Sequence, residues 1–76
     1  MERFYFTFGY DPGFPYQNTY LIVYAKNLDE AIEKFRAKHP DRHLNCVNCA
    51  FFYEEEEWEG SENQKFYPEI PAEVIR

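Results

Sequence analysis

The chain has 76 residues and a formal net charge of −6, and 45% of its residues are hydrophobic while 21% are aromatic. A chain near this length forms one domain with a thin core, since at about 60 residues folding buries only about 60% of the unfolded surface. The apolar content argues against disorder, no apolar run approaches the ~20 residues of a membrane span, and the acidic charge argues against direct nucleic-acid binding.

The first predicted strand covers residues 3–9 and buries one face. Phe4, Phe6 and Phe8 alternate with Arg, Tyr and Thr, which is the period of a half-buried strand. A loop over residues 10–18 follows, although a simple reversal needs little more than a Gly and an Asn. Because this loop is long, stiffened by proline and rich in aromatic rings, it is a candidate binding feature.

A second strand over residues 19–25 and a helix over residues 28–39 come next. The strand is β-branched and aromatic. Asn27 is the expected N-cap, Glu30 is placed to close a capping box, and Pro40 ends the helix. The apolar positions of the helix form a single stripe for packing on the sheet: Leu28, Ala31, Ile32 and Phe35.

The third predicted strand covers residues 47–53, and an acidic segment and tail occupy residues 54–76. One face of this strand is expected to hold Val47, Cys49, Phe51 and Tyr53. Around Trp58 two structures stay open, a short helix that folds the indole back on the sheet or a solvated turn. The tail is expected to lie along the domain through its apolar side chains: Phe66, Tyr67, Ile70, Val74 and Ile75.

Together these elements predict a single α+β domain over residues 1–76 with the order ββαβ. The helix is a crossover between the second and third strands, which favours a three-stranded, mainly antiparallel sheet with strand order 2-1-3. One helix packs on one face of this sheet, and the C-terminal tail is extended. The other face needs cover from the tail, a partner chain or a ligand, so a homodimer stays open.

The first candidate site combines the aromatic loop with a basic cluster near the end of the helix. Aromatic rings stack on bases, and Arg is well suited to bidentate anion contacts. A nucleotide-like anionic ligand is therefore one expected partner, although core packing of the rings and a solvated helix end explain the same residues. The candidate ligand-binding residues are Tyr10, Asp11, Phe14, Tyr16, Gln17, Arg36, His39 and Arg42.

The second candidate site is the acidic run, which is either a solvated face or a mimic of nucleic-acid phosphates that blocks a basic protein surface. Its candidate protein-binding residues are Glu54, Glu55, Glu56, Glu57 and Trp58. Under this hypothesis the partner is a protein with a basic groove, and no direct nucleic-acid or membrane contact is expected.

Metal and catalytic signatures are weak. His39, His43, Cys46 and Cys49 have zinc-ligand chemistry, but all four lie close together in sequence, and strand alternation turns Cys49 inward. The sole serine, Ser61, sits in a Gly-Ser break, and no Gly-rich phosphate loop is present. We therefore expect no catalytic residue, no metal, no cofactor and no enzymatic activity.

The expected compartment is the cytoplasm. The first strand begins almost at Met1, which leaves no room for a signal peptide. Reduced thiols are then the default for the two cysteines.

Several stretches together are similar to a family of small proteins, without an assigned activity, from Gram-positive gut bacteria, their prophages and mobile elements. The matching stretches are Phe6-Thr7-Phe8-Gly9, Phe14-Pro15-Tyr16-Gln17, Ile22-Val23, Phe35 with His39-Pro40-x-Arg42, and Asn48-Cys49-Ala50-Phe51 followed by Tyr53 and an acidic segment with a tryptophan. His43 and Cys46 depart from that pattern, which is a further argument against a zinc site. The resemblance implies a binding protein that inhibits a host defence system, either by sequestering a nucleotide signal or by gripping a defence protein such as a CRISPR effector.

Overall fold

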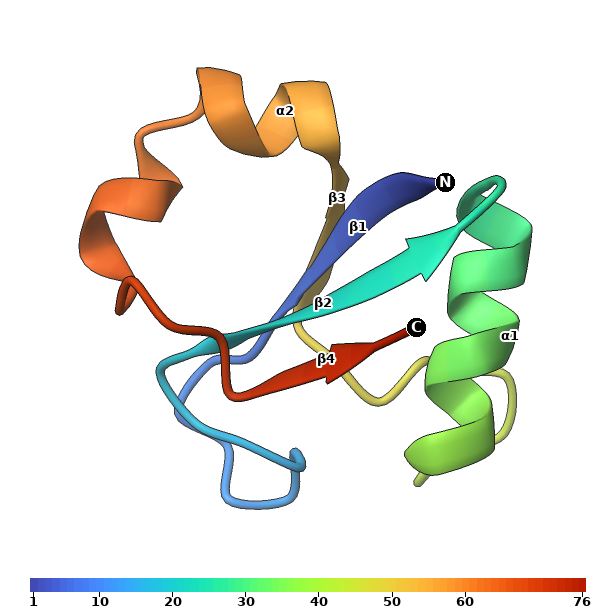
Figure 1. The fold of residues 1–76 in the computed structure, drawn as a ribbon. Coiled ribbons are helices and arrows are strands. Elements are labelled where there is room, and N and C mark those ends of the chain that lie inside the picture. Colours follow the sequence, from blue (N-terminus) through green and yellow to red (C-terminus); the bar gives the residue numbers. More distant parts are fainter.

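The computed structural model describes residues 1–76, apart from the side chain of Asn63. Across these residues the elements are β1 (Glu2–Thr7), β2 (Tyr20–Ala25), α1 (Leu28–Lys38), β3 (Phe51–Glu54), α2 (Glu55–Gly60), a 3-10 turn (Asn63–Phe66) and β4 (Glu73–Ile75). The strands form one mixed sheet in the order β3-β1-β2-β4, with α1 on one side and α2 at the other (Figure 1). The α+β class is therefore confirmed.

The central hairpin of β1 and β2 follows the predicted alternation. The two strands pair antiparallel from Glu2 opposite Ala25 to Thr7 opposite Tyr20. Phe4, Phe6 and Phe8 all enter the main core, as a period-two strand requires. The loop closes through Asn18, whose φ of 56° is a left-handed conformation that Asn tolerates better than most residues.

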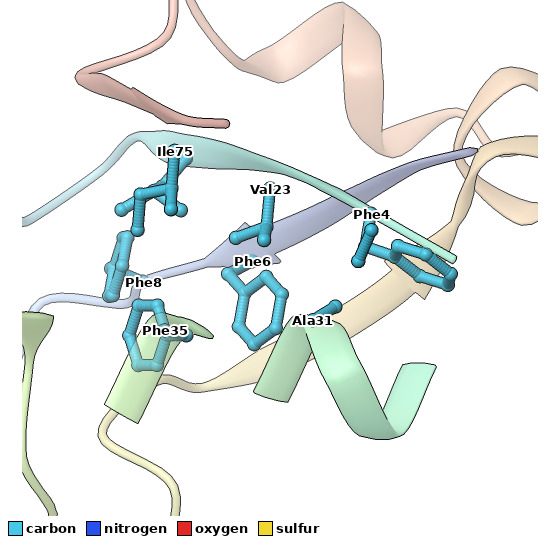
Figure 2. Packing of buried hydrophobic residues seen from close by; sticks show 9 residues of the cluster. Phe4, Phe6, Phe8, Val23, Ala31, Phe35 and Ile75 are labelled. Carbon is cyan, nitrogen blue, oxygen red and sulfur yellow. The ribbon is translucent and has the colours of Figure 1, made fainter. Parts of the chain in front are cut away.

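Helix α1 begins and ends as its caps dictate. The Asn27 side chain accepts a hydrogen bond from the Glu30 N–H at 2.9 Å, and Glu30 accepts one from the Lys26 N–H at 3.1 Å. Its apolar stripe packs Phe35 on Phe6, with ring centroids 4.6 Å apart (Figure 2). This stacking fixes the distance between helix and sheet, and Val23 and Ala31 fill the space beside it (Figure 2).

The third strand is shorter than predicted. It covers Phe51–Glu54 instead of residues 47–53. Asn45 adopts a φ of 61°, and the Cys49 N–H donates to the Val47 carbonyl at 2.8 Å, so the chain turns tightly where a strand was expected. Extended pairing starts only after the Ala50 N–H reaches the Thr7 carbonyl at 2.8 Å.

The predicted face of this strand is consequently wrong. Val47 and Cys49 do pack on the main core, but Phe51 is 66% exposed. Tyr53 lies on the opposite side of the sheet, against the Trp58 cluster. Phe52, which the predicted face did not include, approaches Phe6 with ring centroids 5.8 Å apart.

The predicted sheet, with three mainly antiparallel strands, was wrong in one respect: the C-terminal tail adds a fourth strand. β4 adds a fourth strand parallel to β2, with Ile22 opposite Val74. The Ala72 N–H donates to the Tyr20 carbonyl at 2.9 Å, and Ile75 is only 4% exposed in the main core. The tail is held by backbone pairing and one buried side chain, whereas Phe66 and Ile70, which were expected to anchor it, are 80% and 79% exposed.

The second face of the sheet is covered by the chain itself. Helix α2, which adds to the single helix that was predicted, places Trp58 flat on Tyr5 with ring centroids 4.7 Å apart and an angle of 3° between the planes. Tyr20 completes this second buried cluster, and Tyr67 packs beside it. Of the two structures left open around Trp58, the short helix is the one observed.

No helix in the described part of the chain has both the length and the apolar character needed to cross a bilayer.

Replacing Trp58 by Ala should destabilise the fold strongly. Truncating a buried aromatic side chain costs about 3–5 kcal/mol, and a chain of this size has a free energy of unfolding of roughly 4–11 kcal/mol. Urea unfolding followed by circular dichroism measures the loss. Phe66→Ala is the control, because an exposed ring should change the free energy of unfolding by less than about 0.5 kcal/mol. Equal effects of both substitutions would contradict the assigned role of Trp58.

Candidate functional site

The aromatic loop and the C-terminal end of α1 meet at one corner of the molecule. Arg42 Nη2 lies 3.2 Å from Asp11 Oδ2, and the Arg42 guanidinium lies over the Phe14 ring at 5.3 Å from its centroid. Gly13 makes this approach feasible, because a Cβ there would overlap the guanidinium. The structure therefore brings Asp11, Phe14 and Arg42 together.

Tyr16 and His39 form the second half of this corner, around the tail residue Glu73. Glu73 Oε1 lies 2.7 Å from His39 Nε2 and accepts a hydrogen bond from Tyr16 Oη at 3.0 Å. Lys38 Nζ lies 3.6 Å from Glu73 Oε2. A carboxylate of the chain thus occupies the position at which these residues were expected to hold an external anion.

The remaining predicted ligand-binding residues are placed differently. Gln17 stiffens the loop from within, since its Nε2 donates to the Asp11 and Phe14 carbonyls at 3.1 and 2.9 Å. Arg36 pairs with Asp41 at 3.0 Å. Tyr10 is 84% exposed and contributes no wall to the corner.

The corner is filled and internally neutralised. Every Lys, Arg and His side chain from position 34 to 42 has a carboxylate partner at 2.7 to 3.6 Å. No cavity opens between the loop and the helix end in the described structure. What the arrangement does chemically is to hold the loop, the helix and the tail together.

Two carboxylates of the corner titrate below their ordinary range. The Gly13 N–H and then the Arg42 guanidinium lower the pKa of Asp11. Burial opposes ionisation of Glu73, but the hydrogen bonds from His39 and Tyr16 outweigh it, so the pKa of Glu73 is also lowered. The Asp11 and Glu73 carboxylates are therefore negatively charged at neutral pH, and they attract the side chains of Arg42 and Lys38 respectively.

The acidic segment forms a different kind of surface. Trp58 fixes α2 on the sheet, and Arg3 lies 2.6 Å from Glu55 and 3.6 Å from Glu59. Glu57 Oε1 accepts the Glu54 N–H at 3.1 Å, which secures the first turn of the helix. The remaining carboxylates point outward from a fixed support. The exposed acids of this segment are Glu54, Glu56, Glu57, Glu59 and Glu62.

The four residues with zinc chemistry do not converge. Within the part of the chain that the structure describes, no group of three or more His, Cys, Asp or Glu side chains gathers as a metal site requires. His39 is engaged with Glu73, and Cys46 is exposed. Burial raises the pKa of Cys49 to about 12, which keeps this thiol protonated.

Sequence reasoning missed Glu73 and Phe52. The signal for β4 was present, because two β-branched residues follow Glu73 and Pro71 precedes it. This signal did not predict β4, because the pattern of a three-residue strand is too short to distinguish from coil. For Phe52, the tight turn at Val47 shifted the strand and with it the faces of the aromatic run.

A scan against protein-family models and searches of curated proteins and of solved structures gave no significant match.

Glu73→Gln should destabilise the protein by about 1–2 kcal/mol near neutral pH, because it removes hydrogen bonds to a charged acceptor. The folded pKa of Glu73 lies below its ordinary value of 4.5. Its contribution is therefore present above the unfolded-state pKa and is lost as the pH falls through the folded-state pKa. Urea unfolding at several pH values measures the difference between the two proteins.

The control for this experiment is Glu69→Gln, which removes one exposed carboxylate from the same tail. Its difference from the parent protein should stay below about 0.5 kcal/mol at each pH. A Glu73→Gln difference that is unchanged below the ordinary pKa of Glu would contradict the assigned contact.

Proposed function

We propose that this protein is a non-enzymatic binding module that presents the acidic face of α2 to a basic surface of another protein. The observation that carries the proposal is the fixed mounting of α2, with Trp58 5% exposed beneath it and carboxylates exposed above it. Helix α2 therefore displays negative charge in one orientation. Preorganised groups lose less conformational entropy on binding than mobile ones do.

The distribution of charge supports this choice of surface. No Lys or Arg occurs between positions 43 and 64, whereas five acids lie between positions 54 and 59. Arg3 offsets part of this charge through Glu55 and Glu59. The other carboxylates of this segment have no cationic partner among the described residues. Their negative potential steers a partner of opposite charge and gives specificity.

The loop corner supports a small-molecule function less well. A nucleotide would need room and cations that are available to its phosphates. In the described structure no cavity opens there, and Arg42 and His39 already contact Asp11 and Glu73. Binding an anion would first require breaking these internal pairs.

The biological setting is proposed from the family resemblance of the sequence alone. Small proteins of prophages and mobile elements often act against host defence, and a nuclease of such a system offers a basic nucleic-acid groove. An acidic helix that occupies this groove would compete with the nucleic acid. The proposed partner is therefore a host defence protein, and the proposed activity is inhibition by occupancy.

Charge reversal on the acidic segment, at Glu56 on α2 and at Glu62 just after it, tests this proposal. Glu56→Lys with Glu62→Lys should abolish capture of the partner from a lysate of a Gram-positive gut bacterium. Neither carboxylate forms an ion pair with another described residue, and both are exposed, so the fold should be retained. Affinity capture with quantitative mass spectrometry measures the effect. Capture by the parent protein should also weaken as salt rises, because ions screen exposed charges.

The matched control is Glu33→Lys with Glu69→Lys. This pair is equally exposed, changes the net charge by the same amount, and lies on α1 and on the tail. This control variant should capture at least half as much partner as the parent protein does. Equal loss in both variants would show that net charge alone matters, and retention by the Glu56/Glu62 variant would refute the proposed surface.

A further inference from the structure

We propose that the outer edge of β3 accepts an extended segment of the partner as an additional strand, and that this segment alternates basic and apolar residues. The inference rests on the proposed function, because the partner is the basic protein that α2 attracts. It adds the mode of binding and the chemistry of the bound segment. Strand addition takes affinity from main-chain hydrogen bonds and specificity from alternate side chains.

The edge itself is the first observation. In the described structure β3 has one strand neighbour, β1, and forms the margin of the sheet. A margin strand presents N–H and C=O groups that can pair with another chain. In β3 the groups open to such pairing come before Glu54, because the Glu54 N–H already donates to Glu57 Oε1. Figure 1 shows α2 continuing directly from the end of β3, so a segment laid along this edge runs toward the acidic helix.

The composition of β3 distinguishes it from the opposite margin. Native edges are commonly protected by Pro, by Lys or by inward-pointing charges. Before its terminal Glu54, β3 has none of these, and Phe51 and Phe52 are 66% and 39% exposed. β4 covers only Glu73–Ile75, follows Pro71, and has its first side chain tied to His39. β3 is therefore the more receptive edge.

The two faces of the sheet predict the pattern of the added strand. Phe52 pairs with Phe6 and so lies on the α1 side, whereas Tyr53 pairs with Tyr5 on the α2 side. An added strand points its alternate side chains to these same two faces. Apolar side chains on the α1 side would lie beside Phe52, and basic ones on the other side would face the same way as the acidic helix α2.

Charge selects a basic partner over a second copy of this chain. Two copies paired along β3 would place two chains with net charges of −6 side by side. Like charges placed at an interface oppose association. A segment with several Lys residues instead neutralises the exposed carboxylates of α2, because its charge is complementary to theirs.

A synthetic peptide tests the inference with the full-length protein. The probe is an acetylated and amidated peptide of alternating Lys and Val, eight residues long. Its control keeps the side chains and charge but is N-methylated at every backbone amide, so that it donates no main-chain hydrogen bond. Calorimetry should show at least tenfold weaker binding of the methylated peptide.

The outcomes separate this inference from the proposed function. Equal affinity for both peptides overturns strand addition while leaving charge-driven binding to α2 intact. No binding of either peptide overturns the inference, and capture of the partner from lysate then decides the proposed function separately. A stable dimer of the free protein in light scattering, with the β3 amides protected, overturns it in favour of a second copy.

Amide hydrogen exchange locates the edge that is used. Added peptide should slow exchange within Phe51–Glu54 and leave Glu73–Ile75 unchanged, whereas protection of β4 alone overturns the inference. Phe51→Ser should weaken peptide binding at least fivefold, and its matched control is Phe66→Ser, an exposed Phe of the 3-10 turn. Equal loss in the two variants, with circular dichroism showing both folded, also overturns it.

Discussion

The stack of Trp58 on Tyr5 is the contact on which the architecture depends. A sheet in a chain of this length has two apolar faces, and α1 can cover only one of them. The rings lie 4.7 Å apart and nearly parallel, and they bury the second face with a side chain from an otherwise acidic segment. Without this contact α2 would lose its apolar support, because its other side chains are almost all glutamates.

The same stack explains how an acidic segment becomes an ordered surface. A run of like charges normally stays solvated and mobile. Here one indole holds α2 on the sheet, Arg3 forms ion pairs with Glu55 and Glu59, and Glu57 secures the first turn of the helix. These contacts hold the helix backbone in place, and the exposed carboxylates on the helix are thereby held in a fixed position as well.

At the opposite end of the sheet, Glu73 has the role that an external anion was expected to fill. Tyr16, Lys38 and His39 come from two elements and meet at this one carboxylate. The contact ties β4 to the loop and to α1, and Ile75 completes the core two residues later. The basic cluster therefore serves the fold first, since its charges stabilise a short parallel strand that backbone pairing alone would hold weakly.

Residues with a strong local pattern were predictable from the sequence, and those decided by contacts over a distance were not. The alternation of Phe4, Phe6 and Phe8 and the cap at Asn27 act locally, so they appear in the structure as predicted. β3 was misplaced because a turn at Val47 interrupts an apparently continuous pattern. For the candidate site, proximity of the loop to Arg42 followed from tracing the chain, but the occupation of that corner by Glu73 depends on tertiary pairing.

The division of charge between the two ends links the fold to the proposed function. At the loop corner each cation has an acid partner, so that end exposes little net potential. The surplus of acids is concentrated on α2, next to the exposed rings of β3. Aromatic residues are enriched at protein interfaces, and complementary charge around them steers the partner and gives specificity. Internal neutralisation at one end thus contrasts with the exposed carboxylates of α2, which lie next to the exposed rings of β3.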